Sequence, residues 1–198
     1  MSSTEQLAKR VIVHVGPHKT GSTAIQQCLA SNQSPLNEAG ISYLDGKRIH
    51  DAAMLLVKGA FDEAENLLKA VSQQISDTKA PTVILSQEDF CGDLPGRSRR
   101  RAIYPKLTKN LRIIARSLKP HEITFVFFLR DSDEWIKSCY HQHLKYRTLY
   151  SNLTTFEEHF GGPPIWEAIL EKPKEAFGQN LVVLPYSKVP DAGVRALL

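Results

Sequence analysis

An anion-binding loop is the clearest chemical feature of the sequence. An apolar run, residues 11–15, leads into a loop that combines two glycines, a lysine and three hydroxyl side chains. The loop residues are Gly16, Pro17, His18, Lys19, Thr20, Gly21, Ser22 and Thr23. An amphipathic stretch follows, so loop N–H groups and the positive end of a helix converge on one point. With the ammonium of Lys19 and the hydroxyls, this arrangement predicts a site for a phosphate or a sulfate.

The spacing of this loop departs from that of the nucleotide-kinase loop, which reads G-x-x-x-x-G-K-[ST]. Gly16 and Gly21 have its spacing, but Ser22 stands where its lysine should be. Lys19 comes two residues before the second glycine and must reach the anion from within the loop. We therefore interpret the segment as a relative of the nucleotide loop. The alternative, a glycine-bearing turn that binds nothing, does not explain why lysine, hydroxyls and helix start coincide.

A second candidate phosphate-binding group follows the apolar run at residues 123–129. Arg130 directly follows this run, and Ser138 comes eight residues later within a helical pattern that residues 131–133 can cap. A guanidinium offers a planar fork to phosphate oxygens. Taken alone, such an arginine is more often part of a surface ion pair, but the first loop favours a phosphate clamp.

Two side chains are candidates for a general base. Glu88 follows the apolar run at residues 82–85, at the edge where parallel strands gather functional residues. His50 follows a shorter run, residues 41–44, and imidazole suits proton transfer near neutral pH. Each has a structural alternative, because Glu88 can cap a turn or pair with an arginine, and a single histidine is more often structural.

The elements that must position these residues follow from hydrophobic periodicity. Four runs that do not alternate strictly with polar residues predict strands buried on both faces, at residues 11–15, 82–85, 123–129 and 181–184. Stripes at helical spacing lie at residues 61–75, 103–118 and 135–144. This alternation predicts a three-layer α/β sandwich with a mostly parallel sheet and a nucleotide-triphosphate-hydrolase-like phosphate loop. A weaker fifth strand is expected at residues 41–44, and His14 is expected inside the sheet.

Composition limits the class of protein. The chain has 198 residues, 42% of them hydrophobic, which suits a single domain over residues 1–198. No apolar run is long enough to span a membrane, and the first ten residues hold no apolar secretion signal, so we expect a cytoplasmic protein. Cys28, Cys91 and Cys139 are far apart without CxxC spacing, which argues against a disulfide framework or a zinc site. Each is expected to be a small buried apolar side chain.

The formal net charge of +4 hides an uneven distribution. Residues 97–119 carry nine Lys or Arg and no acid. A solvated helix face is the plain interpretation, and attraction of an acidic glycan is the functional one. Nucleic acid ranks behind both, because no aromatic interleaving accompanies the charge.

The loop and the arginine segment resemble those of sulfotransferases that use 3′-phosphoadenosine 5′-phosphosulfate (PAPS). Residues 15–24 are similar to the family's 5′-phosphosulfate loop, nearest to the heparan sulfate N-sulfotransferase type and to bacterial relatives. The segment from Arg130 to Ser138 is similar to its 3′-phosphate motif. The resemblance implies that the loop binds the phosphosulfate, that Lys19 stabilises the leaving phosphate, and that Arg130 and Ser138 hold the 3′-phosphate.

The same resemblance implies sulfuryl transfer to a hydroxyl or amine of a carbohydrate-like acceptor, release of 3′,5′-adenosine bisphosphate and no catalytic metal. Glu88 lies in a Ser-x-Glu segment similar to that of bacterial relatives, and some relatives carry a base in a loop near the place of His50. Many members continue into a C-terminal loop over the nucleotide, which this chain is expected to lack. Residues 191–198 read as a helix start capped by Asp191.

Two other functions stay open at this point. One is an ATP-dependent kinase, in which Glu88 or Asp89 would hold magnesium beside the loop. The other is a non-catalytic protein of the same fold that binds a nucleotide or a glycan. The lysine position and the Arg130 and Ser138 pair speak against the kinase.

Overall fold

A five-stranded parallel sheet organises the chain in the computed structural model, which describes residues 8–98, 100–145 and 152–188. The strand order is β2-β3-β1-β4-β5, with every neighbouring pair parallel. The strands are β1 (Arg10–Gly16), β2 (Ile41–Tyr43), β3 (Thr82–Ser86), β4 (Glu122–Leu129) and β5 (Leu181–Pro185). The five predicted strands are confirmed, including the short one.

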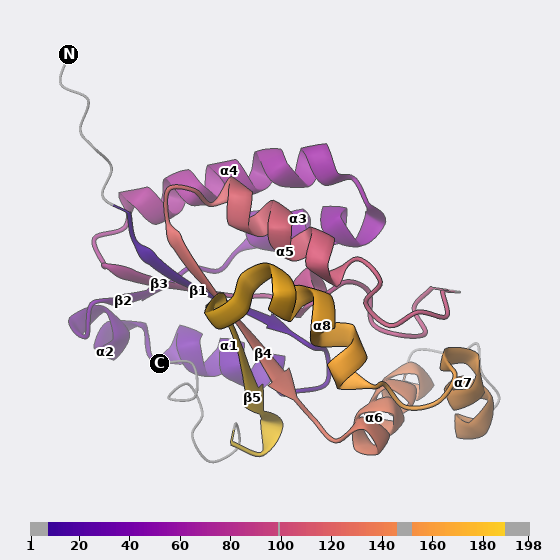
Figure 1. Cartoon of the computed structure of the whole chain (residues 1–198). Coiled ribbons are helices and arrows are strands. Elements are labelled where there is room, and N and C mark those ends of the chain that lie inside the picture. Colours follow the sequence, from indigo (N-terminus) through magenta and orange to yellow (C-terminus); the bar gives the residue numbers. More distant parts are fainter. Residues whose placement is uncertain (1–7, 99, 146–151, 189–198) are drawn as a thin grey trace.

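Helices cover both faces of this sheet, as Figure 1 shows. One face carries α1 (Ser22–Ser31) and α2 (Gln33–Glu38) over a small core that includes Ile25, Leu29 and Phe128. The other face carries most of the apolar core. Its helices are α3 (Lys47–Lys58), α4 (Phe61–Asp77), α5 (Leu107–Ser117), α6 (Ser132–Leu144), α7 (Leu153–Phe160) and α8 (Trp166–Phe177). The predicted three-layer α/β sandwich is therefore present.

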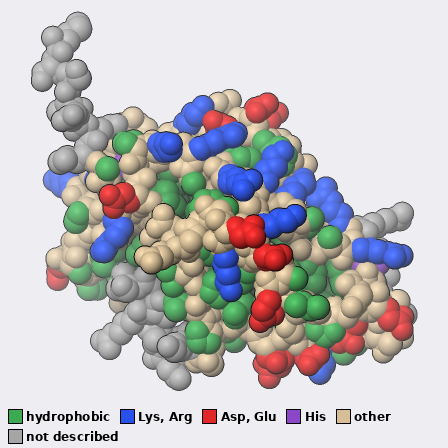
Figure 2. Space-filling model, viewed as in Figure 1, with side chains coloured by type: hydrophobic (Ala, Val, Ile, Leu, Met, Phe, Trp, Pro, Cys, Tyr) green, Lys and Arg blue, Asp and Glu red, His purple; other side chains and the backbone are tan. Residues whose placement is uncertain are grey.

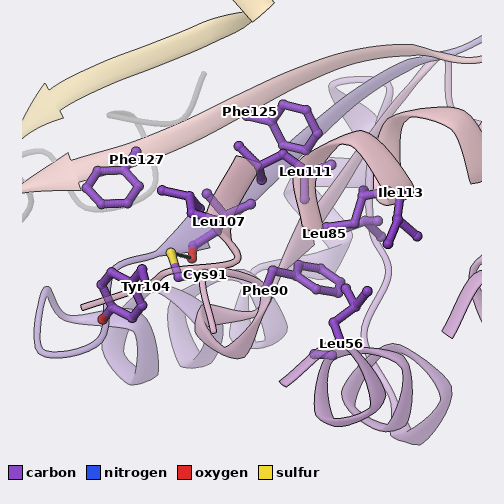
Figure 3. Close-up of a cluster of buried hydrophobic side chains, with 14 of the residues drawn as sticks. Leu56, Leu85, Phe90, Cys91, Tyr104, Leu107, Leu111, Ile113, Phe125 and Phe127 are labelled. Carbon is purple, nitrogen blue, oxygen red and sulfur yellow. Dashed lines mark hydrogen bonds between the residues drawn. The ribbon is translucent and has the colours of Figure 1, made fainter. Parts of the chain in front are cut away.

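The larger core joins the sheet to α3, α5 and the segment between β3 and α5. Figure 3 shows Leu56 of α3 and Leu85 of β3 near Phe90, and Phe125 of β4 beside Leu111 of α5. Phe90 is fully buried and belongs to a 3₁₀ turn, Glu88–Phe90, directly after β3. The turn is thus fixed by its own apolar side chain, and this sets the position of the two acidic residues before Phe90.

Three local predictions need correction. The helix expected from residue 103 begins at Leu107, because Tyr104 has φ 49° and precedes Pro105, which excludes the helical conformation there. His50 lies in the first turn of α3 and not in a loop. Cys28 is partly exposed, whereas Cys91 and Cys139 are buried as expected. The helix start predicted at Asp191 and the basic residue Arg99 lie outside the described residues.

None of the helices in the described part of the chain is long and apolar enough to cross a membrane.

His14 lies inside the sheet as predicted and is fully buried. Its Nδ1 is 2.8 Å from the Ser86 hydroxyl, and its ring meets the edge of Phe128 at 5.3 Å between centroids. Burial lowers the pKa of His14 from 6.5 to about 4. The unfolded chain therefore binds a proton at His14 over a pH range in which the folded protein does not.

We expect acid to destabilise the protein through this residue. As pH falls from 6.5 to 4, the unfolded state takes up the proton first, so the free energy of unfolding drops by about 3 kcal/mol. Urea denaturation of the wild type and of His14→Asn, which can keep a hydrogen bond to Ser86, measures the effect. The variant is less stable at pH 7 but loses about 3 kcal/mol less over this interval. Identical pH slopes for the two proteins would show that His14 does not cause the loss.

Candidate functional site

The loop between β1 and α1 presents free backbone donors. β1 ends at Gly16, and Gly21, with φ 78°, takes the N-cap position of α1. Glycine has no side chain, so within the described residues no side chain caps the first turn of this helix. The N–H groups at the start of α1 are therefore available to a ligand, at the positive end of the helix dipole.

The carbonyl groups of this loop are held by side chains from distant segments. The indole Nε1 of Trp135 donates to the carbonyl of His18 at 2.7 Å, and the guanidinium of Arg130 donates to that of Lys19 at 3.1 Å. Thr20 donates its hydroxyl to the carbonyl of Pro17 at 2.6 Å. The N–H and C=O of one trans peptide point in opposite directions. The bonds to the carbonyls of His18 and Lys19 therefore turn the N–H groups of Lys19 and Thr20 away from Trp135 and Arg130. Thr20 therefore offers its backbone N–H, while its hydroxyl is used within the loop.

A cavity of about 210 Å³ lies over the start of α1. His18, Lys19, Gly21, Ser22 and Thr23 line one side of it. The hydroxyl of Ser22 is buried and has no hydrogen-bond partner among the described residues, so a polar atom is left for a ligand to satisfy.

Lys19 supplies the positive charge of this cavity. Its ammonium donates to the side-chain oxygen of Gln142 at 3.0 Å. Burial lowers the pKa of Lys19, and the cations Lys145 and Arg130 lower it further. Lys19 itself has φ 67°, a conformation that a side chain tolerates only where its surroundings impose it. A dianion in the cavity would offset the repulsion among these three cations.

One face of α6 borders the loop and the end of β4. Asp131 caps this helix by accepting from the N–H of Glu134 at 3.0 Å, which confirms the predicted cap. Glu134, Ser138 and Gln142 follow one another at intervals of four residues, which places them along one side of the helix. Glu134 lies 3.6 Å from Nε of Arg130, while Gln142 binds Lys19. Ser138 is thus placed between the contacts to Arg130 and to Lys19, although no direct bond joins it to either.

Glu88 lines the same cavity as Lys19. Its carboxylate accepts from Nε2 of Gln26 on α1 at 2.9 Å. The backbone of Glu88 approaches the loop so closely that a Cβ at Gly16 would sit 3.3 Å from its Cα, and Gly16 has φ 103°. Glycine at residue 16 therefore allows the strand end and the carboxylate to share one site.

His50 lies apart from this cavity. It is exposed on α3, and its Nδ1 is 3.3 Å from the side-chain nitrogen of Gln87. It lines a second cavity, which is separate from the one over the loop. The structure thus places Glu88 and Lys19 in the lining of one cavity and His50 in the lining of another.

The imidazole of His18 belongs to a buried polar network that the sequence did not reveal. Its Nε2 donates to Asp89 at 3.1 Å, and its Nδ1 lies 3.0 Å from the hydroxyl of Tyr104. Arg97 also contacts the Asp89 carboxylate at 3.3 Å. Burial alone would raise the pKa of Asp89, but the His18 hydrogen bond and the charge of Arg97 outweigh it and lower the pKa. Asp89 is therefore an ionised anchor for the loop and for Arg97.

Three further lining residues were missed, Gln142, Arg97 and the apolar Leu94. Helical spacing from Ser138 could have indicated Gln142, since the two lie four residues apart. No sequence signal singled out Arg97 from the basic run, because its position depends on the irregular segment before α5.

Three cations of the basic run, Lys106, Lys109 and Arg116, lie against α4. The ammonium of Lys109 sits 3.6 Å from the centroid of the Phe61 ring, and Arg116 pairs with Glu65. Figure 2 shows the Lys and Arg side chains gathered on the surface over α4 and α5. These contacts agree with a solvated helix face that packs on its neighbour.

Comparison with known proteins adds a structural likeness. No protein-family model and no curated protein matches the sequence. The structure is similar to the crystal structure of a sulfotransferase from Alicyclobacillus acidocaldarius, with a TM-score of 0.57 and 14% identity. The match covers 96% of this chain and 78% of that one. At this identity the likeness shows a shared fold, an α/β sandwich around a parallel sheet.

Proposed function

We propose that the protein transfers a sulfuryl group from PAPS to a hydroxyl or amine of an acceptor. The observation that carries the proposal is one cavity that joins an uncapped helix start, the unpartnered hydroxyl of Ser22, the ammonium of Lys19 and the carboxylate of Glu88. The resemblance of the loop sequence and the likeness in fold to a sulfotransferase support the same reaction.

The donor would bind at both of its charged ends. The start of α1, with Ser22 and Thr23, would hold the phosphosulfate. Arg130 and Ser138 would hold the 3′-phosphate, which would replace the loose ion pair between the Arg130 Nε and the exposed carboxylate of Glu134, 3.6 Å away. The central carbon of the Arg130 guanidinium lies 5.4 Å from the centroid of the Tyr186 ring, and this contact would help to orient the guanidinium. The donor supplies the sulfuryl group and leaves as 3′,5′-adenosine bisphosphate.

The chain's own residues would stabilise charge and move one proton. The bond from sulfur to the bridging oxygen breaks, and a bond from sulfur to the acceptor oxygen or nitrogen forms. Lys19 would stabilise the negative charge that grows on the bridging oxygen. Glu88 would accept the proton that the acceptor loses, and the Gln26 hydrogen bond keeps the carboxylate directed along the cavity wall.

The kinase alternative finds no support in the geometry. The Asp89 carboxylate is already bound by His18 and Arg97, so it would have to release a cation before it could bind magnesium. The Glu88 carboxylate accepts a hydrogen bond from Gln26, so one of its oxygens is also already in use.

Thermal shift tests the proposed donor. We expect 3′,5′-adenosine bisphosphate to stabilise the protein without magnesium, by about 2.7 kcal/mol at a hundredfold excess over its Kd. Mass spectrometry of acceptors incubated with PAPS then tests for transfer. Stabilisation by Mg-ATP alone would favour the kinase. Nucleotide binding without transfer to any acceptor would favour the non-catalytic alternative.

Substitution of Glu88 separates the two candidate bases. Glu88→Gln retains a partner for Gln26 but cannot take a proton, so turnover should fall by roughly 10²- to 10⁴-fold while bisphosphate affinity stays nearly unchanged. His50→Gln serves as the matched control and should leave turnover within about threefold of wild type, a change too small for a lost general base. The opposite ranking in steady-state assays would make His50 the base.

The 3′-phosphate contact can be isolated by comparing two nucleotides calorimetrically. Arg130→Gln should weaken the binding of 3′,5′-adenosine bisphosphate by roughly 10- to 100-fold. It should weaken the binding of adenosine 5′-phosphate much less, because only the bisphosphate carries a 3′-phosphate. Ser22→Ala should weaken both nucleotides to a similar extent, since it acts on their common end. Equal losses for both nucleotides in Arg130→Gln would contradict the placement.

A further inference from the structure

A second cavity of about 470 Å³ adjoins the cavity over the loop. It is bounded by the ends of β2 and β3, the first turn of α3 and one side of α1. Its volume falls within the range of small-molecule sites. Both cavities therefore lie at the carboxyl edge of the parallel sheet, where ligands bind in such folds.

Gln26 joins the two cavities. Its side chain lines the second cavity, while its Nε2 donates to the Glu88 carboxylate in the first at 2.9 Å and to the Ser86 carbonyl at 3.3 Å. The chain from Ser86 through Gln87 to Glu88 runs along the same boundary. A molecule in the second cavity would therefore have the Glu88 carboxylate at its inner end.

The lining of the second cavity suits hydroxyl groups. Side-chain amides of Gln26, Gln27 and Gln87 both donate and accept hydrogen bonds, and so does the phenol of Tyr43. The ring of Tyr43 supplies an apolar wall beside them. Such alternation of donors, acceptors and an aromatic surface matches a molecule with several hydroxyls.

The charge of this lining disfavours anions. Burial raises the pKa of Tyr43 to about 12, and the nearby carboxylates of Asp45 and Glu88 raise it in the same direction. The cation at the rim, Lys47, pairs with Asp51 at 2.5 Å. The lining of this cavity thus holds the carboxylate of Asp45 and a lysine that is already paired, whereas the lining of the cavity over the loop holds Lys19 and Arg97 together with Glu88.

We propose that the second cavity binds the acceptor, a polyhydroxylated molecule that carries no negative charge, and directs its reacting group toward Glu88. This proposal rests on the proposed function, because it assigns the remaining substrate of that reaction. It assigns ligands of different charge to the two sites. The anionic donor binds over the loop, and a neutral or cationic acceptor binds between α1 and α3. It also gives His50 a place on the acceptor wall without requiring it to move a proton.

Saturation-transfer NMR on the protein saturated with 3′,5′-adenosine bisphosphate tests the class of acceptor. Three trisaccharides of similar size serve as probes: neutral maltotriose, the cationic fully deacetylated chitosan trimer, and anionic trigalacturonic acid. We expect millimolar binding of at least one of the first two, and trigalacturonic acid at least tenfold weaker. Absence of saturation transfer to both maltotriose and the chitosan trimer would overturn the proposal, as would tighter binding of the anionic probe.

Paired variants locate the binding. Gln27 lies on the exposed side of α1. Gln27→Ala should lower the affinity for the saccharide three- to tenfold and leave the affinity for the bisphosphate unchanged. Gln73→Ala, an exposed glutamine on α4, is its control and should change neither. Asp45→Asn should reduce the ratio of the affinities for maltotriose and trigalacturonic acid roughly fivefold, because it removes one charge that repels the anionic probe. Asp62→Asn on α4 is the control and should leave this ratio unchanged.

Equal effects of Gln27→Ala and Gln73→Ala would place the saccharide elsewhere and overturn the assignment of this cavity. The donor readout keeps the two proposals apart. Loss of saccharide binding with intact bisphosphate binding contradicts the acceptor site alone. Failure of the bisphosphate to bind the wild type contradicts the proposed function itself.

Discussion

The site depends on how the carbonyl groups of one short loop are held. A helix start attracts an anion only if its N–H groups are free and the preceding loop turns its carbonyls away. Trp135 and Arg130 achieve this by binding the carbonyls of His18 and Lys19. Both side chains come from the end of β4 and the start of α6, so Arg130, the proposed contact for the 3′-phosphate, also holds the loop. Any displacement of β4 relative to β1 would disturb both.

The segment after β3 also positions residues of the site. The 3₁₀ turn is anchored in the core by Phe90, and this places Glu88 on the cavity wall and Asp89 beneath the loop. Adjacent carboxylates thereby take different roles. Asp89 is buried and bound by His18 and Arg97, which keeps its pKa low and makes it a structural anchor. Glu88 is directed to an uncharged amide on α1 and remains at the junction between two cavities.

This arrangement separates charge along the edge of the sheet. Cations gather where β1 and β4 end, with Lys19 and Arg130 close enough to influence each other. Carboxylates and amides lie where β2 and β3 end, around Tyr43. Since every strand is parallel, all these groups meet at one edge, and the order of strands decides which sign of charge lies where. The gradient from β4 to β2 suits a reaction between an anionic donor and an acceptor without negative charge.

The sequence by itself predicted the five strands and the three-layer class, which the structure confirms, and it suggested the anion loop and the candidates Lys19, Arg130 and Glu88. These features are local, because hydrophobic periodicity and residue types at a strand end require no knowledge of distant segments. Tertiary structure alone decided that His18 and Thr20 turn inward, that Gln142 and Arg97 line the cavity, and that His50 lies on a helix in a neighbouring site. Each of these outcomes rests on contacts between residues far apart in the chain, such as Lys19 with Gln142. Spacing along one sequence carries no record of such contacts, because they arise only when packing brings the ends of β1, β3 and β4 together.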